Sequence, residues 1–509
     1  MNASLFDHKN KDLTDILRGA LATLAGFVGR TGARVIFLFF AGNFYGADNL
    51  GRLAAVIAVV EILVTIGIFG FRRSLLEMLQ KFKGKADEQC RVILSAMTMS
   101  LLIGLVLGTG LAFLWDPIGL YYENAFYSLF AFIVPVMAVM EVILTSIRYK
   151  RIIRYEVFAR SLVEPWTIAL TAVTFFFLGW VSFGLILAYV LSMSAVFVFA
   201  VWAFSKQYSW RKVFAAKLDI GFIKNIGRFS GPTAVVDVIG IAFRRVDVLF
   251  LGFFAADAVV GIYYGVQQIA TVLQKTRHVF DPMLQPVISQ TLDQRGTAGA
   301  GQQLRQVCRW ILTLLAMLLA QMAFYGGPLL GLVGEGFAAG ALALTIVLAA
   351  EALEGTFASA ELPFVFRRPL LNLALTATAF AVHLVGLSYL TPAFGMVGTA
   401  MSFFIALFTL NAMRLVAIRV KFDIGLLHWG YLKPIAAGVV SYLALFYAGQ
   451  FVDLKTGYLV PAGVILGLAV YWAMFWIFRP SSEDREFFSY LRAKKKPAPL
   501  AVDEDFDKV

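Results

Sequence analysis

The sequence contains little of what builds a soluble domain or a catalytic centre. Only 15% of its 509 residues are charged, and it has two cysteines and four histidines. Cys90 and Cys308 are too few for a disulfide framework or a structural zinc site, so we expect two free thiols. No Gly-rich loop is followed by Lys and Ser or Thr, which argues against ATP as the direct energy source. We therefore expect no catalytic residue, no metal and no cofactor.

Long apolar runs dominate the chain instead. It is 60% hydrophobic with a mean hydropathy of +0.78, and about 20 apolar residues suffice for a helix to cross a membrane. The runs predict an all-α polytopic membrane protein with fourteen transmembrane helices. We place the spans at 17–42, 49–71, 92–114, 125–147, 157–179, 182–204, 230–254, 259–281, 310–333, 338–360, 370–390, 395–418, 435–452 and 458–478.

Lysine and arginine collect in every second gap between these spans. Basic loops stay in the cytoplasm, so both termini are predicted to be cytoplasmic. The net charge of +12 arises from these loops, and charges that flank a membrane do not favour nucleic acid as a partner. Residues 1–14 are polar and the first apolar run is too long for a cleaved signal, so we expect it to remain as an anchor.

An internal repeat divides the chain. Shifting the sequence by 210 residues aligns Arg34 with Arg244 and Gly51 with Gly261, among other matches. The shift covers six predicted helices, so both copies keep the same orientation, as in transporters with parallel repeats around a central site. We predict two six-helix lobes around a central cavity, followed by two extra helices. The predicted divisions are an N-lobe at 1–204, a linker at 205–229, a C-lobe at 230–420, spans 13 and 14 at 421–479 and a cytoplasmic tail at 480–509.

Polar and cationic side chains recur inside the spans, where they are costly unless they face a cavity or a partner. The span at 259–281 has a polar stripe that cannot face lipid. Two interpretations stay open: intramembrane pairs such as Arg244 with Asp247 or Arg34 with Asp237, or the lining of a wet cavity. Arginine and lysine in such a cavity suit a phosphate or pyrophosphate group. The candidate substrate-binding residues are Arg30, Arg34, Arg244, Arg245, Gln267, Gln274, Lys275 and Arg277.

Acidic residues in the spans have two interpretations as well. They either bind a coupling proton or sodium ion, or have structural roles. Glu351 and Glu354 lie about one helical turn apart, close enough to affect each other's protonation. The candidates for ion coupling are Glu61, Asp237, Asp247, Glu351 and Glu354. Arg160 and Glu164 are four residues apart, the spacing of a local salt bridge on a helix. We expect His383 to be a hydrogen-bonded histidine that packs between helices.

Residues 44–51 read FYGADNLG, and Arg245-Val246-Asp247 is followed by LFLG and then AVVGIY. These segments resemble the first hairpin and a second-half motif of bacterial oligosaccharide and polysaccharide flippases, which belong to the multidrug/oligosaccharidyl-lipid/polysaccharide exporter superfamily. Residues 282–288, 368–372 and 395–400 resemble further family segments in the same order. The resemblance covers about residues 12–480.

The resemblance implies a flippase, not an enzyme. It implies movement of a polyprenyl-pyrophosphate-linked oligosaccharide across the bacterial cytoplasmic membrane by alternating access, for O-antigen, capsule or exopolysaccharide synthesis. The partners implied are this glycan, membrane lipids and other polysaccharide assembly proteins. The alternatives are a cation-coupled multidrug exporter of the same superfamily and, less favoured, a membrane-embedded glycan polymerase or ligase. The glycan, the coupled ion and the oligomeric state stay open.

Overall fold

The computed structural model describes residues 32–114, 132–278 and 296–478, and every regular element in these ranges is a helix. A helix at 32–40 leads into η1 (Ala41–Tyr45). The first half continues with α2 (Gly46–Ile68), α3 (Phe71–Lys81), α4 (Ala86–Leu114), α5 (Ile133–Tyr149), α6 (Ile153–Phe158), η3 (Ala159–Val163), α7 (Glu164–Phe177), α8 (Gly184–Ser205) and α9 (Trp210–Ala215).

The second half begins with the long helix α10. Its elements are α10 (Ile220–Phe254), α11 (Asp257–His278), α13 (Gly296–Phe324), α14 (Gly326–Gly331), η4 (Phe337–Gly340), α15 (Ala341–Phe357), η5 (Ala358–Glu361), α16 (Leu362–Arg367), α17 (Pro369–Phe422), η6 (Trp429–Tyr431), α18 (Leu432–Phe451) and α19 (Leu459–Ile477). The all-α membrane fold predicted from the sequence is confirmed.

Eight continuous helical stretches in the described ranges are long and apolar enough to cross a membrane. Two of them, Gly32–Lys81 and Pro369–Phe422, each combine two predicted spans. Gly46 (φ +82°) breaks the first and Gly395 (φ +56°) breaks the second, and both have the left-handed backbone that glycine adopts without strain. The count of fourteen spans stays a prediction.

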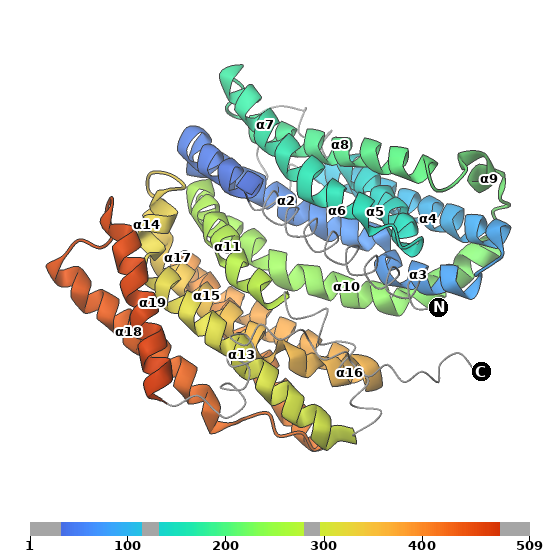
Figure 1. Cartoon of the computed structure of the whole chain (residues 1–509). Coiled ribbons are helices and arrows are strands. Elements are labelled where there is room, and N and C mark those ends of the chain that lie inside the picture. Colours follow the sequence, from blue (N-terminus) through green and yellow to red (C-terminus); the bar gives the residue numbers. More distant parts are fainter. Residues whose placement is uncertain (1–31, 115–131, 279–295, 479–509) are drawn as a thin grey trace, which may run out of the picture.

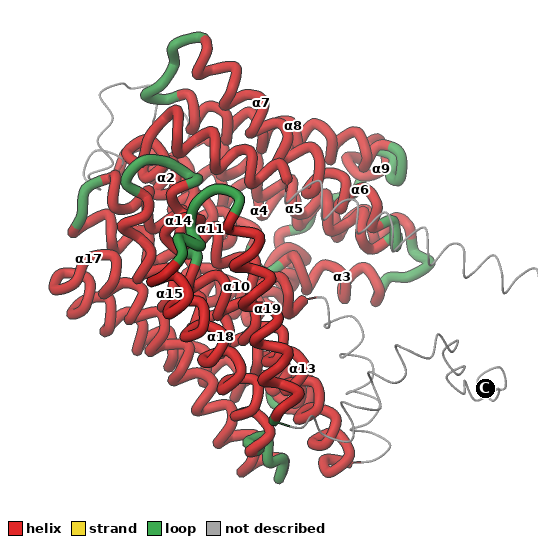
Figure 2. The backbone as a smooth tube through the Cα atoms, turned by 60° about the vertical axis from the view of Figure 1, so that its left-hand side comes forward, coloured by secondary structure: helices red, strands yellow, loops and turns green. Residues whose placement is uncertain are grey.

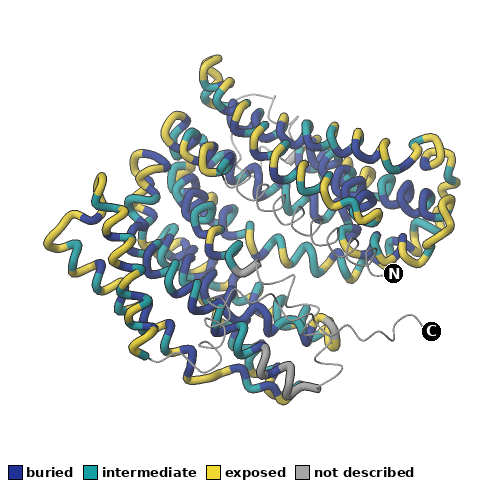
Figure 3. Tube along the Cα trace, viewed as in Figure 1, coloured by how far each residue is buried: buried dark blue, intermediate teal, exposed yellow. Residues whose placement is uncertain are grey.

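The helices form two groups that approach closely at one end and diverge toward the other (Figure 1 and Figure 2). The first group contains α2 to α9, and the second contains α11 and α13 to α19. The end with the turns at 178–183, 255–256 and 452–458 is called the short-loop end, and the end with the connections at 82–85, 206–209 and 423–428 is called the basic-loop end. Each group buries its facing helix surfaces, whereas many exposed residues lie at the loops and on the outward faces (Figure 3).

Helix α10 contacts both groups. It begins at Ile220 because Asp219 caps it, accepting hydrogen bonds from the backbone N–H groups of Gly221 and Phe222. Near its start, Ser230 shares a 2.8 Å hydrogen bond with Ser74 of α3. Farther along, Phe243 stacks on His383 of α17. The last ten residues of the predicted linker at 205–229 belong to α10. The division of the chain into lobes and linker stays a prediction.

The two groups close tightly at the short-loop end through α2 and α11. The backbones of Gly51 and Gly261 approach so closely that a Cβ at Gly51 would overlap the carbonyl oxygen of Asp257. Arg52 of α2 also pairs with Asp257 at 2.9 Å. Nearby, the amide of Asn43 donates to the carbonyl oxygens of residues 332 and 333 at 2.9 and 2.8 Å. Small residues permit this contact between helices, and the repeat had already matched the two glycines.

We expect Gly51→Ala to destabilise the closed short-loop end. The added methyl group meets backbone atoms, which cannot move aside as a side chain does, at a cost of about 1–3 kcal/mol. Gly110→Ala in α4 is the matched control, because no atom lies within 4 Å of a Cβ built there. Thermal unfolding in detergent should show a lower midpoint for the Gly51 variant alone. Equal midpoints would contradict the described packing.

Candidate substrate cavity

A cavity of about 440 Å³ lies between the two groups of helices. This volume is in the range of small-molecule sites. Its walls come from the helix at 32–40 and from α2, α3, α5, α7, α8, α10, α11, α15 and α17, together with Arg160 of η3. The repeat predicts a central cavity between the lobes, and the polar residues of α11 occur at the spacing of one helical face. In the structure the polar residues of α11 face inward: Tyr264, Gln267, Thr271, Gln274 and Lys275 all line the cavity.

The structure brings most of the candidate site residues together. Those that line the cavity are Arg34, Arg244, Arg245, Gln267, Gln274, Lys275, Glu61, Asp247 and Glu351. Arg30 and the side chain of Arg277 lie outside the described residues. Asp237 and Glu354 are described but are not among the lining residues.

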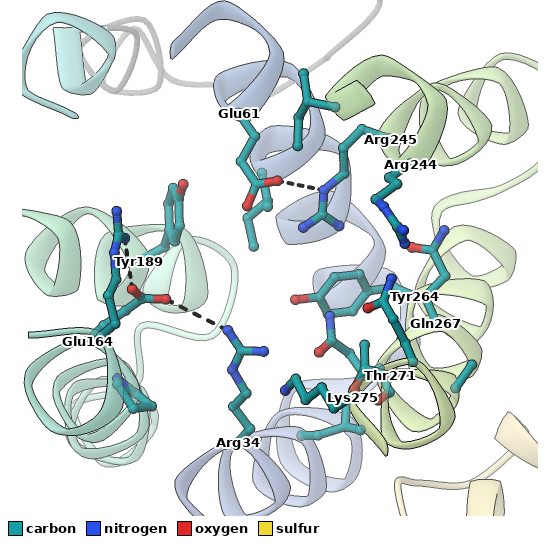
Figure 4. A pocket seen from close by; sticks show the side chains of 18 of the residues that line it. Arg34, Glu61, Glu164, Tyr189, Arg244, Arg245, Tyr264, Gln267, Thr271 and Lys275 are labelled. Atoms are coloured by element: carbon teal, nitrogen blue, oxygen red, sulfur yellow. Dashed lines mark hydrogen bonds and ion pairs between the residues drawn. The ribbon is translucent and has the colours of Figure 1, made fainter. Parts of the chain in front are cut away.

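Three cationic side chains point toward the centre of the cavity from different helices. Figure 4 shows Arg34, Arg245 and Lys275 directed into the same space, with the hydroxyl group of Tyr264 beside them. Arg34 belongs to the helix at 32–40, Arg245 to α10 and Lys275 to α11. A guanidinium offers several N–H donors in a fixed plane and an ammonium offers three, so this arrangement suits the oxygens of an anionic group.

Carboxylates lie beside these cations. Glu61 of α2 accepts a 2.6 Å hydrogen bond from Nε of Arg245, and Glu351 of α15 lies 3.6 Å from Arg244. Gln274, with its amide oxygen turned toward Arg244, accepts from the same guanidinium. The pairs considered from the sequence, Arg244 with Asp247 and Arg34 with Asp237, are not those of the structure, because the true partners lie on other helices.

A chain of alternating charges forms the wall in the first group. Arg34 lies 3.9 Å from Glu164, and Glu164 lies 3.0 Å from Arg160, which also pairs with Glu141. Glu141 in turn lies 3.3 Å from Arg72 of α3. Arg160 lies in the short π-helical segment η3, an element that often marks functional sites.

The sequence revealed only part of this chain of charges. The Arg160–Glu164 pair was expected and is confirmed, but its links to Arg34 and Glu141 are tertiary contacts. Arg72 was assigned to a cytoplasmic loop, so nothing local identified it as a lining residue.

Asp247 is held by neutral groups. It is 1% exposed and accepts from the hydroxyl of Tyr263 at 2.9 Å, the amide of Gln267 at 2.7 Å and the backbone N–H of Val248 at 2.8 Å. A buried carboxylate is tolerated when its oxygens accept several hydrogen bonds. Asp247 therefore fixes α11 against α10, next to the cationic centre.

The two acidic candidates outside the cavity lining have arginine partners. Asp237 lies 3.7 Å from Arg73 of α3. Glu354 accepts from Arg414 at 3.2 Å, and the same guanidinium reaches Glu361 at 2.9 Å. These contacts join helices to one another, which is a structural role. Within the described ranges, no group of three or more His, Cys, Asp or Glu side chains is arranged to hold a metal ion.

Comparison with known proteins identifies the family. Residues 16–292, more than half of the chain, match the family of polysaccharide biosynthesis proteins. The chain belongs to this family. No curated protein matches the chain. The family assignment agrees with the resemblance seen in the sequence.

Solved structures show the same fold at low identity. The lipid II flippase MurJ in an inward closed conformation has a TM-score of 0.73 at 12% identity, covering 92% of this chain and 100% of that one. An inward-facing multidrug resistance MATE transporter of the MOP superfamily has a TM-score of 0.61 at 12% identity, covering 77% and 98%. A MOP superfamily transporter from Pyrococcus furiosus has a TM-score of 0.55 at 14% identity, covering 80% and 95%. This family member is thus a multi-pass membrane protein with a MOP-type transporter fold.

Removing one charge from the wall should destabilise the protein. In Arg160→Met, Glu141 and Glu164 lose the arginine that they share. The side chain of Glu141 is only 8% exposed, so water cannot replace this partner. We expect a loss of about 2 kcal/mol, less than for an isolated buried pair because Arg72 and Arg34 remain. Arg419→Met is the control, since Arg419 pairs with Asp423 at an exposed helix end and should contribute below about 0.5 kcal/mol. Thermal midpoints of the purified variants check this, and equal shifts would refute a role for the chain of charges.

Proposed function

We propose that the protein is a flippase for a polyprenyl-pyrophosphate-linked oligosaccharide in the bacterial cytoplasmic membrane. The observation that carries this proposal is the convergence of Arg34, Arg245 and Lys275 on one cavity between two groups of helices. A pyrophosphate diester has two ionised phosphate groups, and cations from three helices can contact both. The family of polysaccharide biosynthesis proteins and the fold shared with a lipid II flippase support the choice of cargo.

The mechanism follows from the closure at the short-loop end. The headgroup enters the cavity from the basic-loop end, which the positive-inside rule predicts to be cytoplasmic. The pyrophosphate is held by the cationic centre while the polyprenyl chain stays in the lipid. The contact between α2 and α11 then opens as the two groups of helices rock against each other, and the headgroup leaves on the outside. The lobes predicted at 1–204 and 230–420 are the proposed moving units.

The membrane potential assists this movement. Moving one negative charge outward across an inside-negative membrane gains about 2.3 kcal/mol per 100 mV. A dianionic headgroup therefore has a favourable driving force in the direction needed for surface polysaccharide synthesis. No ATP hydrolysis is required in this scheme.

The rival function is cation-coupled export of drugs, because a multidrug resistance MATE transporter has a similar fold. Cationic drugs require an acidic or aromatic lining. Here the carboxylates Glu61 and Glu351 already pair with arginines, and Lys275 points into the centre. The side chains of this cavity therefore favour an anionic cargo.

Neutralising the cationic centre should remove pyrophosphate binding. We expect Arg34→Gln and Lys275→Gln each to weaken binding of undecaprenyl pyrophosphate by about 10- to 100-fold, the contribution of a hydrogen bond to a charged group. Lys212→Gln in α9 is the control, because Lys212 is exposed and is not a cavity-lining residue. Native mass spectrometry of the purified protein, with undecaprenol as the uncharged comparison lipid, measures the difference.

Two results would oppose the proposed function. The first is equal retention of undecaprenyl pyrophosphate and undecaprenol by the unmodified protein. The second is retention of cationic dyes in place of the pyrophosphate, which would assign the chain to the drug exporters.

A further inference from the structure

The pair between Glu61 and Arg245 differs in two ways from the pair between Arg34 and Glu164. It crosses from α2 in the first group of helices to α10, whereas Arg34 pairs within the first group. It is also closer, at 2.6 Å from Nε to Oε2, than the 3.9 Å contact of Arg34. The side chain of Glu61 is 29% exposed and that of Arg245 is 22% exposed, so both are accessible from the cavity.

Glu61 also has fewer cationic partners than Glu164 and Glu141, the acidic residues in the wall of the first group. Glu164 and Glu141 each contact two arginines, so each keeps one arginine partner when the other binds the cargo. Within the described part of the chain, Glu61 pairs with one guanidinium, that of Arg245. A ligand that binds the guanidinium of Arg245 therefore leaves Glu61 without its counter-ion.

The surroundings of Glu61 do not replace this partner. Helix α11 presents the hydroxyl of Tyr264, and α8 presents that of Tyr189, both neutral groups. The cations Arg34 and Lys275 point into the same space, where the proposed function has them contact the cargo as well. Arg72 of α3 lines the same cavity but pairs with Glu141 of α5, which is itself acidic. Helix α4, which also packs on α2, adds no charged residue to the lining.

An anionic cargo and an ionised Glu61 therefore compete for the same guanidinium. When a phosphate oxygen takes Arg245, an ionised Glu61 would lie unpaired at membrane depth beside a dianion, a costly arrangement. Uptake of one proton by a Glu61 oxygen removes that cost. The carboxylate and the proton form a neutral carboxyl group, and no other bond is made or broken.

We propose that Glu61 binds a proton when the cargo binds, so that the cavity takes up its pyrophosphate headgroup and one proton together. This inference rests on the proposed function and names the group that couples it to a proton. Glu61 is thus a positioning residue: when ionised it holds Arg245 away from the cargo and joins α2 to α10, and when protonated it releases Arg245. Release of the cargo and loss of the proton restore the ion pair.

Proton uptake sets the sign of the pH dependence. Because the bound state holds one proton more than the free state, affinity for the headgroup falls as pH rises, by up to about tenfold per pH unit. Glu61→Gln mimics the neutral carboxyl group, so it should bind the headgroup more tightly at high pH, by about tenfold or more, and with no such pH dependence. It should also transport more slowly, because the pair between α2 and α10 cannot form again.

Calorimetry with the full chain in lipid nanodiscs tests the proposal. The probe is synthetic geranylgeranyl-pyrophosphoryl-N-acetylglucosamine, a diester whose two acidic groups stay ionised from mildly acidic to mildly basic pH. Titrations in two buffers with different enthalpies of ionisation count the protons taken up on binding. Glu77→Gln is the matched control, because Glu77 is an exposed glutamate on α3.

The expected result is uptake of about one proton by the unmodified protein and by Glu77→Gln, and none by Glu61→Gln. Binding of the diester without proton uptake, or with equal uptake in the Glu61 variant, overturns this inference and leaves the flippase proposal standing. Binding of the diester no tighter than of geranylgeraniol overturns both. The number of protons that the unmodified protein takes up on binding tests the proposal even if the Glu61 variant fails to fold.

Discussion

The structure depends on one constraint: an ionised side chain at membrane depth needs a partner. The cavity walls contain many such side chains, and the fold meets the constraint by placing arginines and carboxylates on facing helices. Arg160 bridges Glu141 and Glu164, and Glu61 reaches across to Arg245. Apart from Arg160 and Glu164, which lie four residues apart along the chain, each pair is a helix–helix contact as well as a charge contact. Such contacts matter because apolar burial alone gives little preference for protein over lipid. The charges that create the cavity therefore also hold its walls in place.

Close backbone packing complements these pairs at the short-loop end. There Gly51 and Gly261 allow α2 and α11 to meet without intervening side chains. Toward the basic-loop end the helices separate, and α10 follows both groups in turn, contacting α3 near its start and α17 farther along. Tight contact at one end and divergence at the other is the arrangement that a transporter with a central site requires in one of its states.

The sequence predicted the fold class and much of the cavity lining, because both leave local signals. Apolar runs identified the helices, and the spacing of Gln267, Thr271 and Gln274 identified the inward face of α11. The partners of the charges could not be predicted, because pairing is decided by which helices meet. Arg34 pairs with Glu164, over a hundred residues away, and not with Asp237, which pairs with Arg73.

The fold does not decide which cargo this cavity accepts. The same architecture occurs in a lipid II flippase and in MATE transporters at about 12% identity, so the side chains must set the preference. Here the described lining has six cationic and five acidic side chains, so its formal charges nearly cancel. The cationic residues are Arg34, Arg72, Arg160, Arg244, Arg245 and Lys275, and the acidic residues are Glu61, Glu141, Glu164, Asp247 and Glu351. In the proposed function, a dianion competes with these carboxylates for the same arginines. The ion pairs that let these arginines lie at membrane depth would therefore make cargo binding an exchange of one anion for another.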